Sequence, residues 1–367
     1  MQTYDRIYIE HWLKEGHKTC PKTQQVLSHQ MLIPVYTLRS LIQQWCEANG
    51  VDLPKKVSRG GMQRQVSSGT GGSVEAGDRA LILRMKERLA STDVNVQRAA
   101  AGEFRLLAKR SVGNRTCIGE AGVIPLLVTL LKTEDTQVQE HAVTALLNLS
   151  INYNNKGTIV AAGAIEPIVR VLQYGSTEGR ENSAATLFSL SVIDENKISI
   201  GQSGAIPALV DLLMHGSARG KKDAATALFN LSIYQGNKGR AVRSGVIPPL
   251  MDLLMDRGAG MTDEALAILA ILATSLEGRN AIGQAAAVPV LVDLLTSGSP
   301  RNKENAASVL YSLCVNGTEH TREVLKLQAS IPLGQLLRHG TSRAKRKASQ
   351  LLQHLQEQGD VQGFVVC

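Results

Sequence analysis

The chain has 367 residues and a formal net charge of +8, with 43% apolar but only 4% aromatic residues. A core poor in aromatics has to be built from Leu, Ile, Val and Ala, which favours packed helices over an aromatic-rich β-sandwich. The cysteines are odd in number and form no CxxC pair, which argues against a disulfide framework and favours a reducing compartment. They are Cys20, Cys46, Cys117, Cys314 and Cys367.

No segment of the sequence has the pattern of a targeting or membrane-spanning element. The first residues, MQTYDRIYIEHW, carry charges early and lack the long apolar stretch of a signal peptide. The longest uncharged apolar stretch, residues 265–276, is too short to cross a bilayer. We therefore expect a soluble protein of the cytoplasm, the nucleus or both.

The first 57 residues predict two helices joined by a loop. One helix runs from Thr3, a typical N-terminal cap, to Gly16, a typical stop, and a second ends at Gly50. Residues 58–77 are rich in Ser and Gly and predict a flexible linker.

The loop after the first helix contains half of a zinc-site pattern. In EGHKTCP, His17 lies three residues before Cys20, but tetrahedral zinc needs four ligands. The remaining candidates, His11, His29 and Cys46, have irregular spacing. The sequence therefore predicts no metal site. It also contains no phosphate-binding glycine loop and no assembled catalytic set, so no cofactor and no catalytic residue are expected.

From residue 78 onward two phrases repeat every 41 residues. The first, of the type GAIPALVDLL, places Pro207, Pro248 and Pro289 one period apart. The second, of the type ALFNLS, carries a column of penultimate leucines one period apart. These are Leu149, Leu190, Leu231, Leu272 and Leu313. Two phrases in phase over so long a stretch identify an internal repeat.

Each repeat predicts one short helix and two longer helices, which is the armadillo pattern. We expect an all-α right-handed solenoid over residues 78–358, with about six repeats from Arg79 to Lys326 and a polar remnant near Gln358 as a terminal cap. Residues 359–367 form a tail. A single repeat cannot bury its apolar stripe, so neighbouring repeats have to stack.

The armadillo resemblance implies that the third helix of each repeat lines an inner groove. Exposed positions there include Asn148, Ser189, Asn230 and Ser312. The asparagines resemble the ladder with which nuclear-import adaptors hold an extended peptide. The tryptophans of those adaptors are replaced here by Thr144, Ala185 and Thr226. A basic chain is also a poor receptor for basic localisation signals, so the import reading is disfavoured.

Several cations fall at or just before the first turn of the third helices, where they oppose the helix dipole at a cost of about 0.3–1 kcal/mol each. They are Arg180, Lys221, Lys222, Lys303 and Arg346. One interpretation is a groove for acidic or phosphorylated protein segments, formed by Asn148, Arg180, Lys221, Lys222, Asn230 and Lys303. The other is plain solvation beside Glu181 and Glu304.

The first 57 residues closely resemble the later two-thirds of a U-box, the zinc-free relative of the RING finger. The run from GHKTCP to LIQQWCEANG carries the resemblance. A U-box followed by a linker and armadillo repeats is similar to the plant U-box/armadillo ubiquitin-protein ligases. In that family hydrogen bonds and packing replace the metal, so the resemblance implies that His17 and Cys20 need no zinc.

The resemblance also implies a function without a catalytic nucleophile. A U-box docks a ubiquitin-conjugating enzyme while the repeats hold a protein substrate or regulator, and no nucleic acid is expected. Trp12, Pro21 and Gln24 match the family's docking contacts, whereas Tyr4, Ile9 and Leu13 are better interpreted as core, with a core position as the alternative for Trp12. The family's opening strand and loop have no counterpart here, so the resemblance implies a partial α+β U-box over residues 1–57. Two hypotheses follow: a ubiquitin ligase, or a non-catalytic armadillo adaptor.

Overall fold

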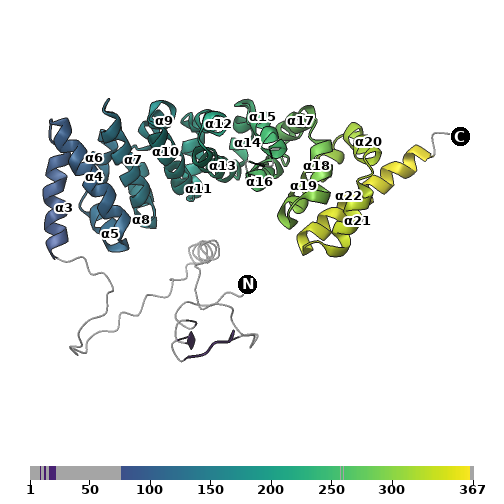
Figure 1. Cartoon of the computed structure of the whole chain (residues 1–367), viewed down its shortest axis with the longest axis horizontal. Coiled ribbons are helices and arrows are strands. Elements are labelled where there is room, and N and C mark those ends of the chain that lie inside the picture. Colours follow the sequence, from purple (N-terminus) through teal and green to yellow (C-terminus); the bar gives the residue numbers. More distant parts are fainter. Residues whose placement is uncertain are drawn as a thin grey trace, which may run out of the picture. The chain divides into compact units, whose positions relative to one another are not determined.

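The computed structural model describes residues 9, 12–13, 16–21, 76–256, 258 and 260–363. The chain separates into two compact units, Met1–Gly69 and Thr70–Cys367. Predictions that concern Gln24, the second N-terminal helix and residues 58–75 of the linker lie outside the described residues, while Ala76 and Gly77, expected in the linker, open helix α3. The second unit contains all the labelled helices in Figure 1.

The second unit is a stack of helices. It opens with the pair α3 (Ala76–Leu89) and α4 (Val94–Arg110). Six three-helix units follow in the described chain. Their first helices are α5 (Val112–Glu120), α8 (Tyr153–Ala161), α11 (Asp194–Gln202), α14 (Gln235–Arg243), α17 (Leu276–Gln284) and α20 (Thr318–Lys326). Their second helices are α6 (Ile124–Leu130), α9 (Ile165–Tyr174), α12 (Ala205–His215), α15 (Ile247–Met255), α18 (Val288–Ser297) and α21 (Ser330–His339).

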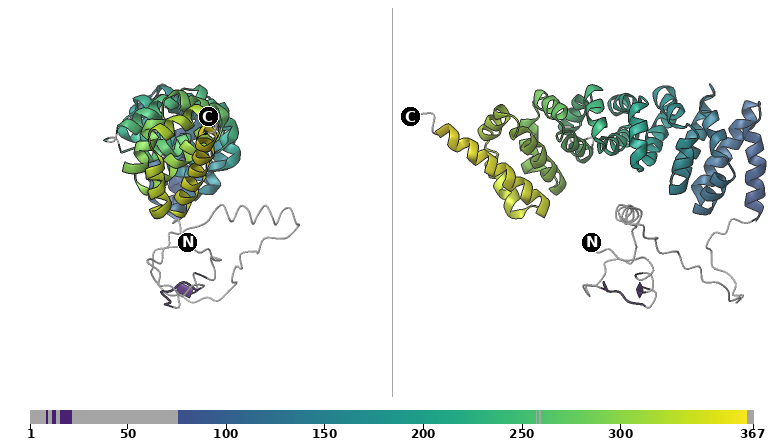
Figure 2. Two further views of the ribbon diagram at one scale, coloured as in Figure 1. Left: turned by 90° about the vertical axis from the view of Figure 1, so that its right-hand side faces the viewer. Right: turned by 180° about the vertical axis from the view of Figure 1, so that it is seen from behind.

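The third helices follow one another along the whole stack, and each contacts the next. With α4 at its start, this third-helix row comprises α4, α7 (Thr136–Ser150), α10 (Thr177–Leu190), α13 (Ala218–Ser232), α16 (Thr262–Leu272), α19 (Pro300–Cys314) and α22 (Ser342–Gly363). The units succeed each other along the long axis of the stack and superpose when it is viewed from one end (Figures 1 and 2). The expected all-α stack of three-helix repeats is confirmed.

The segment expected as a terminal remnant completes a sixth three-helix unit. Its last helix, α22, buries Ala344, Ala348, Leu351 and Leu355, which lie on one face at helical spacing. One core runs continuously from α3 to α22, built of Leu, Ile, Val and Ala with Phe104 as its largest fully buried side chain. The leucines of the 41-residue column are all buried in it, as the period predicts.

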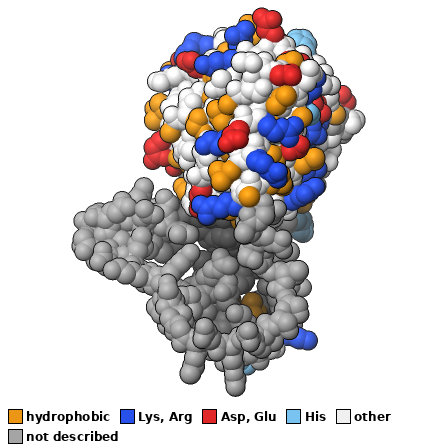
Figure 3. Space-filling model, turned by 90° about the vertical axis from the view of Figure 1, so that its left-hand side faces the viewer, with side chains coloured by type: hydrophobic (Ala, Val, Ile, Leu, Met, Phe, Trp, Pro, Cys, Tyr) orange, Lys and Arg blue, Asp and Glu red, His pale blue; other side chains and the backbone are white. Residues whose placement is uncertain are grey.

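Charged side chains do not gather by sign at the α3 end of the stack. Basic, acidic and apolar side chains are interspersed there (Figure 3). Among the described helices, no single one is long and apolar enough to cross a membrane. Helices α17 and α18 meet that criterion only when taken together, and they are bent by 89° where they meet.

A left-handed turn residue separates the first and second helices of each unit. Gly122, Gly163, Gly204 and Gly245, one period apart, have φ between +69° and +83°. At the next equivalent position stands Ala286, with φ +50°. A side chain with a Cβ pays about 1–2 kcal/mol for this conformation, whereas glycine does not.

Buried asparagines donate hydrogen bonds to the carboxyl-terminal ends of helices in the third-helix row. The carbonyl groups in the last turn of a helix have no partner within the helix. The Asn155 amide on α8 donates to the Leu149 carbonyl of α7 at 3.1 Å and to the Arg115 carbonyl of α5 at 2.9 Å. Equivalent bonds join Asn114 to Leu107, Asn196 to Leu190 and Asn237 to Leu231. One amide thus joins three helices of two units.

The turn before α18 yields a stability prediction. Replacing Ala286 by glycine should raise the free energy of unfolding by about 1 kcal/mol, because the strain is relieved. The methyl group that is removed is exposed, so little packing is lost with it. Ala285→Gly is the matched control, since that neighbour has φ −79° and gains nothing from glycine. Urea unfolding followed by circular dichroism measures both. An equal effect of the two substitutions would contradict the assignment of strain.

The asparagine contacts yield a second prediction. Asn155→Ala should lower the free energy of unfolding by about 2 kcal/mol, because two buried carbonyl groups lose their donor. Asn154→Ala, at the exposed neighbouring position on the same helix, should change it by less than about 0.5 kcal/mol. The midpoint of urea unfolding distinguishes the two outcomes, and similar midpoints for both variants would refute the role given to Asn155.

Candidate functional site

In the N-terminal unit the structure describes three helical residues, Ile9, Trp12 and Leu13, and the loop from Gly16 to Pro21, which Trp12 holds closed. The Trp12 indole Nε1 donates to the Thr19 carbonyl oxygen at 2.8 Å. Its ring stacks on the His17 imidazole, with centroids 3.9 Å apart and planes 21° apart. Ile9 and Cys20 are buried, in line with the core role expected for Ile9. The stack on His17 and the hydrogen bond to Thr19 thus hold the HKTC loop against Trp12.

This geometry gives Trp12 a structural role beside the docking role predicted for it. Trp12 and Pro21 are both half-buried, so each still has exposed surface. Because the loop from His17 to Thr19 is fixed against Trp12, the position of Pro21 directly after Cys20 depends on it as well. The docking roles of Trp12 and Pro21 stay predictions, and Gln24 lies outside the described residues.

The third-helix row carries a regular series of polar contacts between neighbouring helices. In each, a side chain near the start of one row helix meets the residue that caps the next; we call these the cap contacts. The pairs are Arg98–Asp135 (2.5 Å), Glu140–Ser176 (3.0 Å), Glu181–Ser217, Asp263–Ser299 (3.5 Å) and Glu304–Thr341 (2.8 Å). The capping side chain also accepts from a backbone N–H of its own helix, as Asp135 does from Val138.

The first cap contact is an ion pair, and the others join a carboxylate to a hydroxyl group. The Arg98 guanidinium, hydrogen-bonded to Asp135, lowers the pKa of that carboxyl group, and the Val138 backbone N–H adds to the effect. In turn, the pKa of Arg98 is raised, chiefly by the same hydrogen bond. Both shifts favour the charged forms, so this contact holds over the whole neutral pH range.

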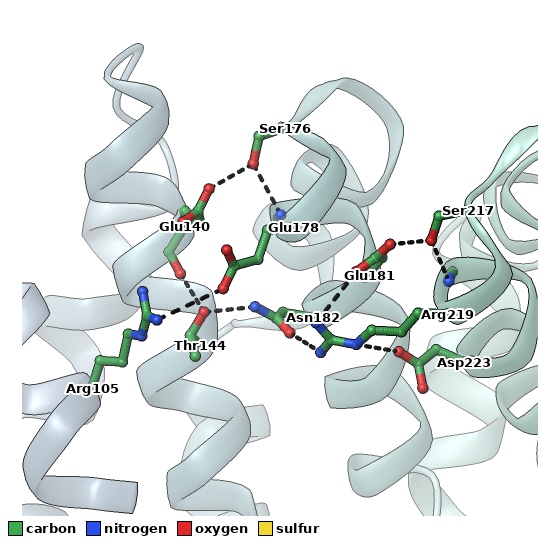
Figure 4. A network of polar contacts seen from close by, with 12 residues as sticks. Arg105, Glu140, Thr144, Ser176, Glu178, Glu181, Asn182, Ser217, Arg219 and Asp223 are labelled. Carbon is green, nitrogen blue, oxygen red and sulfur yellow. Dashed lines mark hydrogen bonds and ion pairs between the residues drawn. The ribbon is translucent and has the colours of Figure 1, made fainter.

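Further polar bonds cross-link the first four helices of the row, from α4 to α13 (Figure 4). Arg219 on α13 lies 3.3 Å from Glu181 and donates to Asn182 at 2.7 Å, both on α10. Asn182 in turn donates to the Thr144 hydroxyl of α7 at 2.7 Å. The buried Glu181 carboxylate is therefore compensated by a guanidinium and by the Ser217 hydroxyl group.

Two further charges in Figure 4 show how tightly the row is packed. Arg105 on α4 reaches past α7 to Glu178 on α10, at 3.8 Å. Asp223 on α13 lies 3.5 Å from Arg219, yet desolvation raises the pKa of its carboxyl group and outweighs the attraction of that guanidinium. Most of the charge on this part of the row is thus matched from within the protein.

The predicted groove asparagines act as ties between repeats. The Asn148 amide donates to the Arg105 carbonyl of α4 at 3.1 Å. The Asn230 amide donates to the carbonyl and the hydroxyl oxygens of Ser191, at 2.9 and 2.7 Å. Their amide donors are therefore engaged by the preceding helix of the row and not directed solely at a partner. A role of these residues in partner binding is not tested by the structure and stays a prediction.

The predicted groove cations fall into two groups. Arg180 donates to the Leu172 carbonyl at 2.9 Å and pairs with Asp211 of the next unit at 2.6 Å, so it too joins helices. Lys222 is exposed, and Lys221 and Lys303 are half-exposed. Within the described part of the chain, the ammonium groups of these three lysines make no hydrogen bond or ion pair. They are the members of the predicted groove whose charge is available to a partner.

One buried cation donates hydrogen bonds to two neighbouring helices of the row. Lys156 on α8 donates to the carbonyl oxygens of Ser150 and Ser189, at 2.6 and 2.8 Å, and to the Ser189 hydroxyl group at 2.6 Å. All these partners are neutral, so burial lowers the pKa of Lys156 to about 8. The Ser189 hydroxyl, expected as an exposed groove position, is consequently engaged from inside.

The cap contacts were not predicted from the sequence, where Glu181 and Glu304 were named only as solvated charges beside the groove cations. Glu140, Glu181, Asp263 and Glu304 lie on the same 41-residue period as the leucines, separated by one or two repeats. A column-by-column comparison of polar residue types would have found them. In the described chain, His, Cys, Asp and Glu side chains form no group of three that could hold a metal ion.

Comparison with known proteins matches both parts of the chain. The family model of the plant U-box protein ARM repeat region matches residues 82–366, and that of the U-box domain matches residues 2–51. The Arabidopsis thaliana U-box domain-containing protein 14 is 57% identical over 151 residues, 41% of this chain and 23% of that protein. The E3 ubiquitin-protein ligase SPL11 of Oryza sativa subsp. japonica is 54% identical over 151 residues, 41% of this chain and 21% of that protein.

The matched stretch spans less than a quarter of the length of these two relatives. Among solved structures, an engineered protein has a TM-score of 0.69 and 28% identity, covering 77% of this chain and 69% of that one. A computationally designed armadillo repeat protein for modular peptide recognition has a TM-score of 0.58 and 26% identity, covering 63% of this chain and 99% of that one. Both support the repeat architecture.

The depressed pKa of Lys156 makes stability depend on pH. Between about pH 8 and the ordinary lysine value of 10.5, the unfolded chain keeps a proton that the folded chain has lost. The free energy of unfolding should therefore rise with pH in this window, by at most about 1.4 kcal/mol per pH unit. Urea unfolding at pH 8, 9 and 10, compared with Lys156→Met, isolates the contribution of this group. The exposed Lys132→Met is the control, and three parallel profiles would contradict the prediction.

Proposed function

We propose that this chain, which belongs to the family of plant U-box proteins with an armadillo repeat region, acts as a U-box ubiquitin-protein ligase. One observation carries the proposal: a U-box model and an armadillo-repeat model match separate, successive parts of the same chain. The similar protein SPL11, named as an E3 ubiquitin-protein ligase, supports the same activity. In this proposal the protein acts in the cytoplasm, the nucleus or both.

The N-terminal unit docks a ubiquitin-conjugating enzyme that carries ubiquitin as a thioester. Trp12, Pro21 and Gln24 form part of the docking surface. The stack of Trp12 on His17 and its bond to Thr19 support this role, because they fix the loop that presents Pro21. Pre-ordering such a loop lowers the entropic cost of binding.

The repeats hold a protein substrate or regulator on the third-helix row. Transfer then depends on proximity, because a substrate lysine held near the thioester reacts as in an intramolecular reaction. The designed armadillo protein described for modular peptide recognition supports the use of such a stack for binding extended segments. Lys221, Lys222 and Lys303 give the row a preference for acidic or phosphorylated segments.

The proposed docking contact can be tested by ubiquitin transfer. The whole chain, incubated with activating enzyme, conjugating enzyme, ubiquitin and ATP, is expected to attach ubiquitin chains to itself. Pro21→Ala should slow this reaction about tenfold, the effect of losing about 1.4 kcal/mol at a central interface contact. Trp12→Ala should slow it at least as much, since it removes a contact and also releases the loop. Immunoblotting for ubiquitin over time provides the rates.

Arg170→Glu, at an exposed site on α9, is the control and should leave the rate unchanged. The melting temperature of the repeats, followed by circular dichroism, should be the same in all four proteins. Chain formation by Pro21→Ala at the wild-type rate would contradict its docking role. If the wild-type protein, with folded repeats, formed no chains with any conjugating enzyme tried, the non-catalytic adaptor would replace the ligase.

A further inference from the structure

The series of cap contacts is interrupted at one place in the middle of the row. Lys222 occupies the position on α13 that Glu181 occupies on α10 and Asp263 on α16, one period away on either side. One period after the capping Ser217, and one before Ser299, stands Gly258, which has no side chain to offer. No cap contact joins α13 to α16 in the described chain.

Helix α16 differs from its neighbours in the same region. It begins at Thr262, about a turn later than the repeat would place it, and its N-cap residue, Met261, makes no side-chain hydrogen bond to the helix. Asp256, two residues before Gly258, accepts a hydrogen bond from the Gly258 backbone N–H at 3.0 Å and so stabilises the turn before α16. The interruption therefore involves both partners of the missing contact. One is the residue near the start of the row helix, here Lys222, which we call the column residue of the cap contact. The other is the residue that caps the next helix.

The intact contacts show what chemistry would complete the series. Where the column residue is a carboxylate, the cap is a hydroxyl; where it is the cation Arg98, the cap is the carboxylate of Asp135. Lys222 is the other cation of the column between α4 and α19. By the same pairing rule its partner is a carboxylate or another anion, and the protein has glycine at that point.

The acidic side chains near Lys222 on α13 and α10 are already engaged by other groups. On the same helix, the half-exposed Lys221 precedes it, and Asp223 follows it. The Asp223 carboxylate lies against Arg219, and its pKa is raised by desolvation. The buried Glu181 is matched by Arg219 and Ser217. The ammonium group of Lys222 is thus exposed, with no hydrogen bond or ion pair to any described residue.

We propose that Lys222 is the anion-binding position of the third-helix row, and that an extended segment of a partner protein places an acidic side chain there. The acidic group takes the place beside Lys222 that Asp135 takes beside Arg98, and so completes the interrupted series between α13 and α16. The inference rests on the proposed use of the row to hold a protein. It specifies the charge of the bound segment and the point at which that charge is read.

Selection from a displayed library of random twelve-residue peptides tests this position while the partner itself is still unidentified. The whole chain is the bait. Peptides selected on the wild-type protein should share Asp or Glu at one position. Selection on Lys222→Gln should lose that preference, and selection on Lys222→Glu should enrich Lys or Arg there instead. Arg170→Glu, which changes charge equally on α9, should select the wild-type motif.

Synthetic peptides then measure the effect. Replacing the selected Glu by Gln should weaken binding to the wild-type chain about tenfold, and should leave binding to Lys222→Gln unchanged. A version with phosphoserine at this position distinguishes a phosphorylated partner from an acidic one by which binds more tightly. Because Lys222 is exposed, its variants should melt at the wild-type temperature.

An acidic preference that survives charge reversal at Lys222, or a selection that yields no acidic motif, would overturn the inference. Failure of the ligase proposal gives a different result. A chain that forms ubiquitin conjugates but selects no acidic peptide refutes only the anion-binding position. A chain that selects acidic peptides through Lys222 but forms no conjugates refutes only the ligase.

Discussion

The stack depends on donors for the carbonyl groups at the ends of its third helices. Each unit is too small to bury its own apolar stripe, so its third helix has to be packed on all sides except one. Its last carbonyl groups are then cut off from water. Buried asparagines such as Asn155 and Asn237 supply the donors, and each bonds to two helices at once. The apolar packing of the units and the hydrogen bonding of their buried backbone carbonyl groups thus depend on the same residues.

The same constraint decides which side chains remain for binding. Because neighbouring row helices have to be held in register, most polar groups on the row are engaged by the next helix. Arg180, Asn148 and Asn230 are examples. Of the charged residues in the predicted groove, Lys221, Lys222 and Lys303 make no hydrogen bond or ion pair with any described residue. In the proposed binding of a partner, these few lysines would therefore be presented on a support that many inter-helix contacts hold in place.

The 41-residue period was sufficient to predict the architecture, because burial of the leucine column follows directly from spacing. It was not sufficient for the candidate site. Whether Arg180 faces a partner or Asp211 depends on how two units are rotated against each other, and spacing within one unit does not contain that angle. The stacking of Trp12 on His17 depends likewise on the path of a loop. The cap contacts, by contrast, follow the same 41-residue period, so a comparison of the polar residues at equivalent positions of the repeats would have predicted them.

The turns that precede the second helices give the stack a direction. The left-handed residue in these turns is glycine in the first four units, whereas it is Ala286 in the fifth and Gln328 in the sixth. Energies in such an array combine from unit to neighbour, so strain placed at one end is felt first at that end. An unfolding motor or protease that engages the carboxyl terminus would meet these two strained turns first, while one that starts from the amino-terminal side would reach the four glycine turns before them.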